Sequence, residues 1–287
     1  MSRLPRVHFA NSGIPVTRLI SGGNPLCANS HYSREMNEDM ARYFTPERVL
    51  GYLQDIEACG INTIQARGDY HRILYWLELF RREGGKLHWI AQTASEMSDI
   101  FQNIRILGQA GAVGIYHHGT QTDRFWQEGR IDDVCDYLKC IRDTGVQVGL
   151  GTHIPAVIEY AEEKDWDIDF YMASLYNISR KPRSSALVTG HASERCEEEF
   201  LHDDPPKMCH VIRQTGKMCL AFKILAASRR CSTQDEVATT FRQTFANIKP
   251  VDAVVVGMFP KYSNQIQLNI QHTLDALSVP LSGPERT

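Results

Sequence analysis

The sequence lacks the features that would place it in several large classes of protein. No apolar run approaches the roughly 18 to 20 residues that a membrane span needs, and the formal net charge is only −3 over 287 residues. So small a charge gives no electrostatic reason to expect a nucleic-acid or membrane partner. The first residues, MSRLPRVHF, contain no apolar stretch typical of a secretion signal. We therefore expect a cytoplasmic protein whose partner is a small-molecule substrate.

The sequence also lacks any Cys-x-x-Cys pair, although it contains eight cysteines. Disulfide frameworks belong to small secreted domains that cannot build a sufficient core, whereas 43% of this chain is hydrophobic. We expect free, mostly buried thiols. The cysteines are Cys27, Cys59, Cys135, Cys140, Cys196, Cys209, Cys219 and Cys231.

What the sequence does contain is a steady alternation of short β-rich runs with stretches of helical period. The expected strands are 19–21, 63–65, 87–92, 112–117, 147–151, 169–174, 218–223 and 253–257. Such an alternation indicates a parallel sheet covered by helices. Eight units in a chain of this length predict one (β/α)8 TIM barrel domain over 1–287. A doubly wound open sheet is the alternative, but no Gly-x-Gly-x-x-Gly follows the first strand, which argues against a dinucleotide-binding version.

Two segments interrupt the alternation. Residues 178–203 form a long connection after the sixth strand, with no clear period, and a loop of this length in a compact domain is usually functional or disordered. We expect it to emerge at the C-terminal face of the barrel and to serve as a lid. The polar, proline-bearing tail 278–287 is expected to fray.

Four segments carry a resemblance to a known family. They are SGIPVTRLISGG (12–23), GINTIQARGDY (60–70), GLGTHIPAVIEYA (149–161), and AVVVGM followed by QIQLN (253–269). In order and spacing they resemble segments of the aldo-keto reductase superfamily, over nearly the whole chain. The resemblance implies the same barrel, with a short N-terminal hairpin (roughly 7–16) closing its bottom.

The catalytic tetrad that the resemblance implies is incomplete. The family uses an aspartate, a tyrosine, a lysine and a histidine. Here Tyr70 matches the tyrosine and His118 the histidine, but Gln65 stands in place of the aspartate and Gln92-Thr93 offers no lysine. A tyrosine with a pKa near 10 is a poor acid at neutral pH without a neighbouring cation. Tyr70 is therefore either a weakened catalytic group or an ordinary aromatic residue at the rim.

The nicotinamide site that the resemblance implies is altered as well. The serine, asparagine and glutamine that hold the carboxamide are replaced by Gly151, Thr152 and Met172, and glycine and methionine supply no comparable hydrogen bonds. Phe222 matches an aromatic residue that stacks on the cofactor. The remaining family contacts, to the 2′-phosphate and adenine, have counterparts in Lys261, Gln265 and Asn269. NADP is thus a candidate cofactor, but with weakened nicotinamide contacts.

New ionisable groups stand at the ends of strands. Lys223 ends the seventh expected strand in apolar surroundings, which would lower its pKa and make it a competent base or amine nucleophile. The alternative is a lysine that pairs with a carboxylate or extends out of the barrel mouth. His117 and His118 are adjacent, so only one of them can face the barrel mouth. His153 ends the fifth strand. Without a His-x-His pair or a well-placed carboxylate, we expect no metal site.

A polar ring is expected around the same mouth. Its members follow different strands and are expected to bind substrate: Asn24, Gln65, Arg67, Gln92, Tyr176 and Arg180. Arginine binds carboxylates or phosphates through a planar fork, although Arg67 could equally form a structural ion pair. A ring of amides, guanidinium and phenol suits a hydroxyl-rich ligand better than an apolar carbonyl.

Three functions follow from these observations. The first is an enzyme that performs acid-base chemistry (elimination, hydration or isomerisation) on a small hydroxyl-rich carbonyl or sugar-like compound. In that enzyme Tyr70, His118, His153 and Lys223 are the candidate catalytic residues. The second is an NADP-dependent oxidoreductase of the aldo-keto reductase type. The third is an inactive barrel that serves as a binding subunit, and fold alone does not choose among them.

Overall fold

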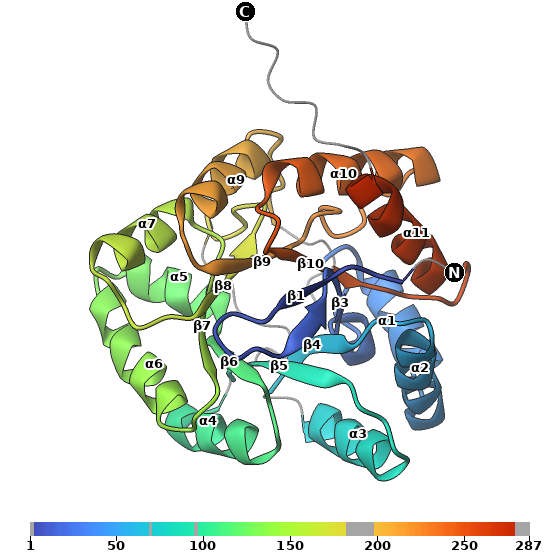
Figure 1. The fold of residues 1–287 in the computed structure, drawn as a ribbon, viewed down its shortest axis with the longest axis horizontal. Helices are drawn as coiled ribbons and strands as arrows, with labels where there is room; N and C mark the ends of the chain where they lie inside the picture. Colours follow the sequence, from blue (N-terminus) through green and yellow to red (C-terminus); the bar gives the residue numbers. More distant parts are fainter. Residues whose placement is uncertain (1–2, 69–70, 95–96, 182–197, 279–287) are drawn as a thin grey trace, which may run out of the picture.

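Eight parallel strands close into a barrel in the computed structural model, which describes residues 3–68, 71–94, 97–181 and 198–278 (Figure 1). The strands neighbour one another in the order β10-β3-β4-β5-β6-β7-β8-β9, so the first and last strands of the barrel pair with each other. This closure confirms the (β/α)8 barrel and excludes the doubly wound open sheet. The barrel strands are β3 (Leu19–Gly22), β4 (Thr63–Arg67), β5 (His88–Gln92), β6 (Gly114–His117), β7 (Gln147–Thr152), β8 (Phe170–Ser174), β9 (Met218–Phe222) and β10 (Ala253–Gly257).

Helices surround the barrel on its outer side (Figure 1). The α-helices are α1 (Arg34–Tyr43), α2 (Pro46–Ala58), α3 (His71–Arg82), α4 (Ile100–Gln109), α5 (Gly119–Gln127), α6 (Val134–Arg142), α7 (Pro155–Glu163), α9 (Asp204–Gln214), α10 (Gln234–Asn247) and α11 (Gln265–Ser278), and the 3-10 helices are η1 (Pro25–Cys27) and η2 (Ile131–Asp133). Helix α2 shows the local reasons for these boundaries. The Thr45 side chain accepts from the Arg48 amide and Pro46 opens the helix, while Gly60 takes a φ of 94° that suits glycine after the last turn.

Alternate residues of each strand face opposite sides, which divides the core into two layers. On β4, Ile64 packs outward against the helices, whereas Gln65 and Arg67 share the inward face. The interior of the barrel is filled by buried residues from the strands and the hairpin: Phe9, Val16, Ile20, Ile90, Tyr116, Phe170, Met172, Met218, Leu220, Ala253 and Val255. The barrel is thus packed through its lower and middle levels, and polar inward-facing residues are found toward the C-terminal ends of the strands, here called the mouth.

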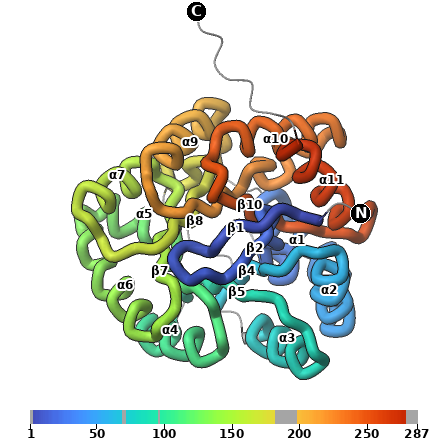
Figure 2. The backbone as a smooth tube through the Cα atoms, in the orientation of Figure 1, coloured from blue at the N-terminus to red at the C-terminus, as the bar shows by residue number. Residues whose placement is uncertain are grey.

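A two-stranded hairpin closes the opposite end. Strands β1 (Arg6–His8) and β2 (Pro15–Thr17) pair antiparallel, and Figure 2 shows the hairpin crossing the ring of strands. Phe9, fully buried, places its ring centroid 4.9 Å from that of Phe170 at the start of β8. The expected hairpin at the bottom of the barrel is therefore confirmed.

Three other expectations concern particular parts of the chain. The seven cysteines among the described residues are all free. None of the described helices is long and apolar enough to cross a membrane. Residues 182–197 of the expected lid and 279–287 of the expected frayed tail lie outside the described residues, so both remain predictions.

Candidate functional site at the mouth of the barrel

Three polar side chains from neighbouring strands join inside the barrel. Gln65 of β4 donates from Nε2 to the hydroxyl of Tyr116 of β6 over 2.8 Å, and that hydroxyl donates to Oε1 of Gln92 of β5, also over 2.8 Å. Gln65 and Tyr116 are buried, at 8% and 4% exposure. The sequence predicted Gln65 and Gln92 in this region but not Tyr116. Tyr116 could have been found, because it lies one residue before the end of the expected strand 112–117, beside the end of the neighbouring strand that carries Gln92.

Arg67 adds a buried positive charge above this layer. It is the last residue of β4 and lies two positions after Gln65, so both face inward. Its exposure is only 5%. A guanidinium in this position faces the level where a ligand of a barrel enzyme binds, at the C-terminal ends of the strands.

A histidine-carboxylate pair stands on the neighbouring side of the mouth. Nδ1 of His153, immediately after β7, lies 2.6 Å from Oδ2 of Asp123 on α5, and both side chains are at least nine-tenths buried. A carboxylate only accepts, so Nδ1 carries the proton and donates it. The His153 backbone amide also donates to both oxygens of Asp123, at 3.2 and 3.3 Å. These contacts fix the ring orientation and direct Nε2 away from the carboxylate.

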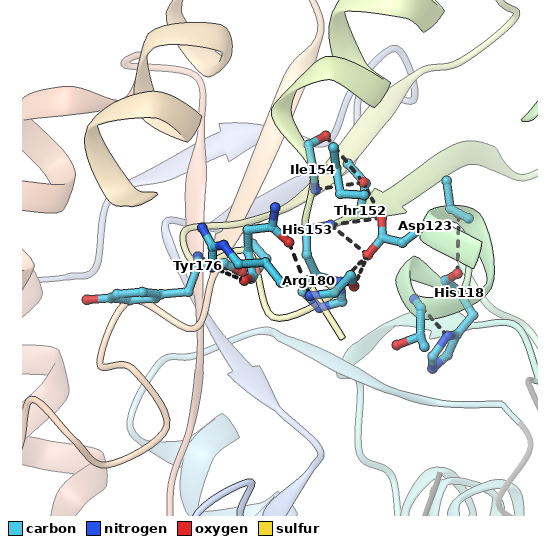
Figure 3. Close-up of polar contacts among 12 residues, drawn as sticks. His118, Asp123, Thr152, His153, Ile154, Tyr176 and Arg180 are labelled. Atoms are coloured by element: carbon cyan, nitrogen blue, oxygen red, sulfur yellow. Dashed lines mark hydrogen bonds and ion pairs between the residues drawn. The ribbon is translucent and has the colours of Figure 1, made fainter. Parts of the chain in front are cut away.

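Two hydroxyls complete the surroundings of the Asp123 carboxylate (Figure 3). Thr152 donates to Oδ1 over 2.5 Å, and Ser179, in the connection after β8, donates to Oδ2 over 2.5 Å. The Ser179 hydroxyl lies 3.4 Å from Nδ1 of His153. In a serine-histidine-aspartate hydrolase the serine contacts the ring nitrogen opposite the carboxylate. Here both partners lie at the same nitrogen, so this is not the arrangement of a nucleophilic serine.

The ring of His153 faces the mouth. It meets Phe222, the last residue of β9, edge to face with centroids 5.6 Å apart. A Cβ added to Gly119 would approach Cε1 of His153 to 3.3 Å, so glycine at this position leaves space beside the ring. Barrel enzymes place their reacting groups at the ends of strands in this way. The sequence predicted His153 but not Asp123, which lies 30 positions away on α5, a helix with no clear apolar period in the sequence.

The two adjacent histidines at the end of β6, His117 within the strand and His118 just after it, differ in position. His117 faces outward, donates to or accepts from Thr122 over 2.8 Å and stacks on Tyr137 at 5.0 Å; burial lowers its pKa to about 3. His118 follows the strand and caps α5, with Nδ1 accepting from the Thr120 amide at 3.1 Å. Nδ1 of His118 is thus engaged in helix capping.

Lys223 lies on the side of the mouth formed by the loop after β9. It takes a left-handed φ of 57°, as do three residues shortly after it in the same loop, and Nζ lies 5.9 Å from the ring centroid of Phe200. The guanidinium of Arg229 lies 4.1 Å from the same ring. Lys223 is therefore half-buried in a cation-aromatic cluster. Its role as a nucleophile or base remains a prediction.

Other predicted substrate ligands have structural partners. Arg180 forms an ion pair with Asp204, the first residue of α9, through two guanidinium nitrogens. Tyr176 is 3% exposed and packs on Phe200 at 5.2 Å, and burial raises its pKa. Asn24 precedes η1, where its carbonyl accepts the amides of residues 27 and 29. For Arg180 the ion pair, rather than a ligand, accounts for the orientation of the guanidinium.

The residues matched to cofactor contacts also have partners in the protein. Oε1 of Gln265 accepts the Phe259 amide at 2.7 Å. Lys261 forms an ion pair with Asp39 of α1, and Asn269 is buried at 6% exposure within α11. NADP binding therefore remains a prediction, and it would require Lys261 to exchange one partner for another.

The altered nicotinamide positions have a packing explanation. A Cβ on Gly151 would lie 2.9 Å from Cδ2 of Tyr116 and 2.9 Å from the carbonyl oxygen of His117. The ring of Tyr116 thus occupies the space of a side chain at position 151. The hydroxyl of Thr152 is used by Asp123, and Met172 is 1% exposed in the barrel interior.

The structure brings some of the candidate catalytic and substrate-binding residues together and leaves others apart. Gln65 and Gln92 are joined through Tyr116, and His153 faces Phe222, whereas the contacts described above for His118 and Lys223 lead to α5 and to Phe200. Tyr70 lies outside the described residues. Within the part of the chain that the structure describes, no three metal-ligating side chains gather.

Comparisons with known proteins identify the fold but neither a family nor an activity. No family model matches the chain, and no curated protein matches it. Among solved structures it is similar to Gox0644 in its apo form, with a TM-score of 0.56 and 8% identity over 98% of this chain and 91% of that one. It is also similar to phospho-2-dehydro-3-deoxyheptonate aldolase (DAHP synthase) from Thermotoga maritima, with a TM-score of 0.53 and 12% identity over 96% and 72% of the two chains. A truncated form of 3-deoxy-D-arabino-heptulosonate 7-phosphate synthase from the same organism gives 0.52 and 13% over 95% and 90%. At these identities the likeness shows a TIM barrel.

Proposed function

We propose that this protein is an enzyme that moves protons on a small hydroxyl-rich carbonyl or sugar-like compound, in an elimination, hydration or isomerisation. The observation that carries the proposal is the 2.6 Å contact between Nδ1 of His153 and the carboxylate of Asp123 at the mouth of the barrel. A carboxylate at one ring nitrogen holds the imidazole in the tautomer whose other nitrogen accepts a proton, and stabilises the imidazolium that forms.

The proposed step uses that second nitrogen. Nε2 of His153 takes the proton from the carbon next to the carbonyl. The C–H electron pair forms a carbon-carbon double bond, and the carbonyl electrons move onto oxygen to give an enediolate. Arg67 is the proposed partner of that oxygen, because a buried guanidinium stabilises developing negative charge. Return of the proton from Nε2 to the former carbonyl carbon, with transfer of the neighbouring hydroxyl proton to the former carbonyl oxygen, completes an isomerisation. Transfer of the proton from Nε2 to a hydroxyl on the next carbon, which then leaves as water while the carbonyl re-forms, completes an elimination.

The substrate class is proposed from the polar floor of the mouth. Gln65, Gln92 and Tyr116 bring two amides and a phenol together, and such groups supply the donors and acceptors that hydroxyl groups require. The two structural neighbours named as heptonate aldolase and heptulosonate phosphate synthase are named for sugar-derived compounds, but they share only the fold with this chain.

The aldo-keto reductase resemblance supports a second candidate, an NADP-dependent oxidoreductase. Four segments in family order favour it. The occupied space at Gly151 and the edge-to-face packing of His153 on Phe222 weigh against the family's mode of holding nicotinamide. Losing two or three hydrogen bonds would weaken nicotinamide binding by about one to three orders of magnitude. We therefore place proton transfer first.

The test is deuterium exchange. The protein is incubated in D2O with a panel of aldoses, ketoses and sugar acids, and the proton signal next to the carbonyl is followed by NMR. We expect its loss with at least one compound, and a rate about 10²- to 10⁴-fold lower in the His153→Ala variant, the range that general acid-base catalysis contributes. His8→Asn, at an exposed position in the bottom hairpin, is the matched control and should exchange at the wild-type rate.

The alternatives give different results in the same preparation. NADPH oxidation that depends on Tyr70 and not on His153 would establish the oxidoreductase instead. Saturable binding of panel compounds with neither exchange nor NADPH oxidation would identify a binding subunit. Exchange that survives His153→Ala at full rate would refute the proposed base.

A further inference from the structure

One oxygen of Asp123 serves two donors. Oδ2 lies 2.6 Å from Nδ1 of His153 and 2.5 Å from the hydroxyl of Ser179. The hydroxyl also lies 3.4 Å from Nδ1, so the three groups form a compact cluster. All three side chains are buried, where hydrogen bonds to charged groups are stronger than in water.

The placement of Ser179 is built into the fold. Its carbonyl accepts from Nε2 of Gln127 on α5, and its amide donates to Oδ1 of Asn177 over 3.1 Å. The Asn177 amide in turn donates to Oδ2 of Asp204 on α9 over 3.1 Å. The turn 177–180 is therefore fastened to the helix that carries Asp123 and to α9, and it delivers the hydroxyl to the carboxylate.

The hydroxyl opposes the attraction between the carboxylate and a charged imidazole. A hydroxyl that donates to Oδ2 neutralises part of the negative charge that would otherwise stabilise imidazolium, because hydrogen bonds to a charged group favour that charged form. The carboxylate becomes a weaker partner for the extra proton on His153. A base that takes up and returns a proton at neutral pH needs a pKa near that pH.

We infer that Ser179 is a positioning residue that tunes the His153–Asp123 pair: its hydroxyl limits the proton affinity of His153 while it holds the carboxylate in place. The inference rests on the proposed function for its purpose, but the tuning itself is measurable without a substrate. It assigns a specific task to the first turn of the connection after β8.

Other ionisable groups on the packed elements set the background. His117 on β6 lies close enough to Asp123 for the carboxylate to raise its pKa, against the larger lowering effect of burial. His118 begins α5, and Arg180 with Asp204 form an ion pair beside the turn. These groups stay unchanged in the variants below, so they affect all of them equally.

The experiment is an NMR titration of the full-length protein labelled with 15N at histidine. The His153 resonance is assigned by its loss in His153→Asn, and its pKa is measured in the wild type, Ser179→Ala, Ser179→Thr and Asp123→Asn. Ser174→Ala is the matched control. Its hydroxyl is also buried and lies at the end of β8, five residues before Ser179, but it donates to the Tyr176 carbonyl and not to Asp123.

A tuning role and a purely structural role of Ser179 predict opposite changes in the pKa of His153. Asp123→Asn removes the negative charge and should lower the pKa of His153. Ser179→Ala should raise it, by roughly half to one unit if one hydrogen bond is lost, whereas Ser179→Thr and Ser174→Ala should leave it near the wild-type value. If Ser179 only kept the turn folded, its loss would loosen Asp123 and the pKa would fall.

The outcomes separate the inference from the proposed function. No change or a fall in Ser179→Ala, with a fall in Asp123→Asn, overturns the inference and leaves the histidine-carboxylate pair intact. If the pKa of His153 does not change in Asp123→Asn, the carboxylate does not act on the imidazole, and the proposed role of His153 as the base is wrong as well. Far-UV circular dichroism establishes that each variant is folded. If the alanine variant does not fold, Ser179→Cys replaces it, because a thiol of similar size is a weaker donor and should raise the pKa of His153 in the same direction; no change or a fall in a folded Ser179→Cys variant overturns the inference.

Discussion

At the scale of single residues, His117 shows how burial decides the state of a histidine. Its ring stacks on Tyr137, contacts Thr122 and is 2% exposed, so the charged form would lose its hydration without a paired carboxylate. Burial accordingly lowers its pKa to about 3. His153, immediately after the neighbouring strand β7, has a carboxylate at 2.6 Å. Two buried histidines thus differ in electrostatic surroundings, because His153 is hydrogen-bonded to a carboxylate and His117 to a hydroxyl.

This difference predicts a pH dependence of stability. The folded pKa of His117, about 3, lies below the ordinary value of 6.5 that applies to the unfolded chain. Between these values the unfolded chain binds a proton that the folded chain does not. The free energy of unfolding therefore falls as the pH falls through this window, by about 1.4 kcal/mol per pH unit for one proton. The contribution is fully present above pH 6.5.

Replacement of His117 by phenylalanine should make the free energy of unfolding less dependent on pH between pH 6 and 5. The slope should fall by about 1.4 kcal/mol per pH unit, which is what the uptake of one proton contributes. Phenylalanine keeps the stacking on Tyr137 and loses the contact with Thr122, so some stability is lost at every pH. The measurement is urea denaturation at closely spaced pH values. An unchanged slope in the variant would show that His117 takes up a proton in the folded state.

At the scale of elements, β7 is shaped by the residues that pack on it. A Cβ on Gly149 would lie 2.4 Å from the ring of Phe170, and a Cβ on Gly151 would lie 2.9 Å from the ring of Tyr116. Two glycines on the inward face of one strand therefore make room for two aromatic rings from its neighbours. This places the Tyr116 hydroxyl between Gln65 and Gln92. The glycines of β7 therefore determine how the polar side chains at the floor of the mouth are arranged.

Substitution of Gly151 by serine tests this packing. The added Cβ would meet the His117 carbonyl at 2.9 Å and the Gly119 amide at 3.0 Å, both backbone atoms that do not move easily. We expect a loss of about 1 to 3 kcal/mol, as for other overpacked cores, measured by chemical denaturation. Gly51→Ala is the control: position 51 in α2 has no atom within 4 Å of an added Cβ, and alanine there should stabilise by up to about 1 kcal/mol. A stable Gly151→Ser protein would show that Tyr116 shifts freely.

The elements also show what a sequence can and cannot reveal. The eight strands were predicted within one or two residues of their ends, because buried parallel strands are short apolar runs bounded by polar or turn residues. Inward positions such as Gln65 and Gln92 followed from the ends of those strands. Asp123 and Ser179 did not, because they meet His153 from 30 and 26 positions away. These contacts depend on where α5 begins and on how the turn 177–180 folds. Neither segment has a hydrophobic periodicity from which its structure could be predicted.

At the scale of the whole molecule, the hairpin and the mouth lie at opposite ends of one packed interior. Phe9 contacts Phe170 at the bottom, Phe170 approaches Tyr116 with centroids 6.5 Å apart, and Tyr116 joins Gln65 and Gln92 above. A continuous column of side chains thus runs through the barrel. Because close-packed interiors transmit strain, we expect the two ends to unfold together, as one domain.

Removal of the lowest ring tests that expectation. Phe9→Ala deletes a fully buried aromatic side chain and should cost about 3 to 5 kcal/mol, whereas His8→Ala, at an exposed neighbouring position, should cost little. Unfolding is followed by far-UV circular dichroism and by fluorescence of the four tryptophans, all of which lie outside the hairpin. In a single cooperative unit the two probes give the same midpoint, and Phe9→Ala lowers both by the same amount. Separate midpoints would mean that the chain contains more than one folding unit. The same conclusion would follow if Phe9→Ala shifted the midpoint of only one probe, because the column of side chains would then not couple the hairpin to the mouth.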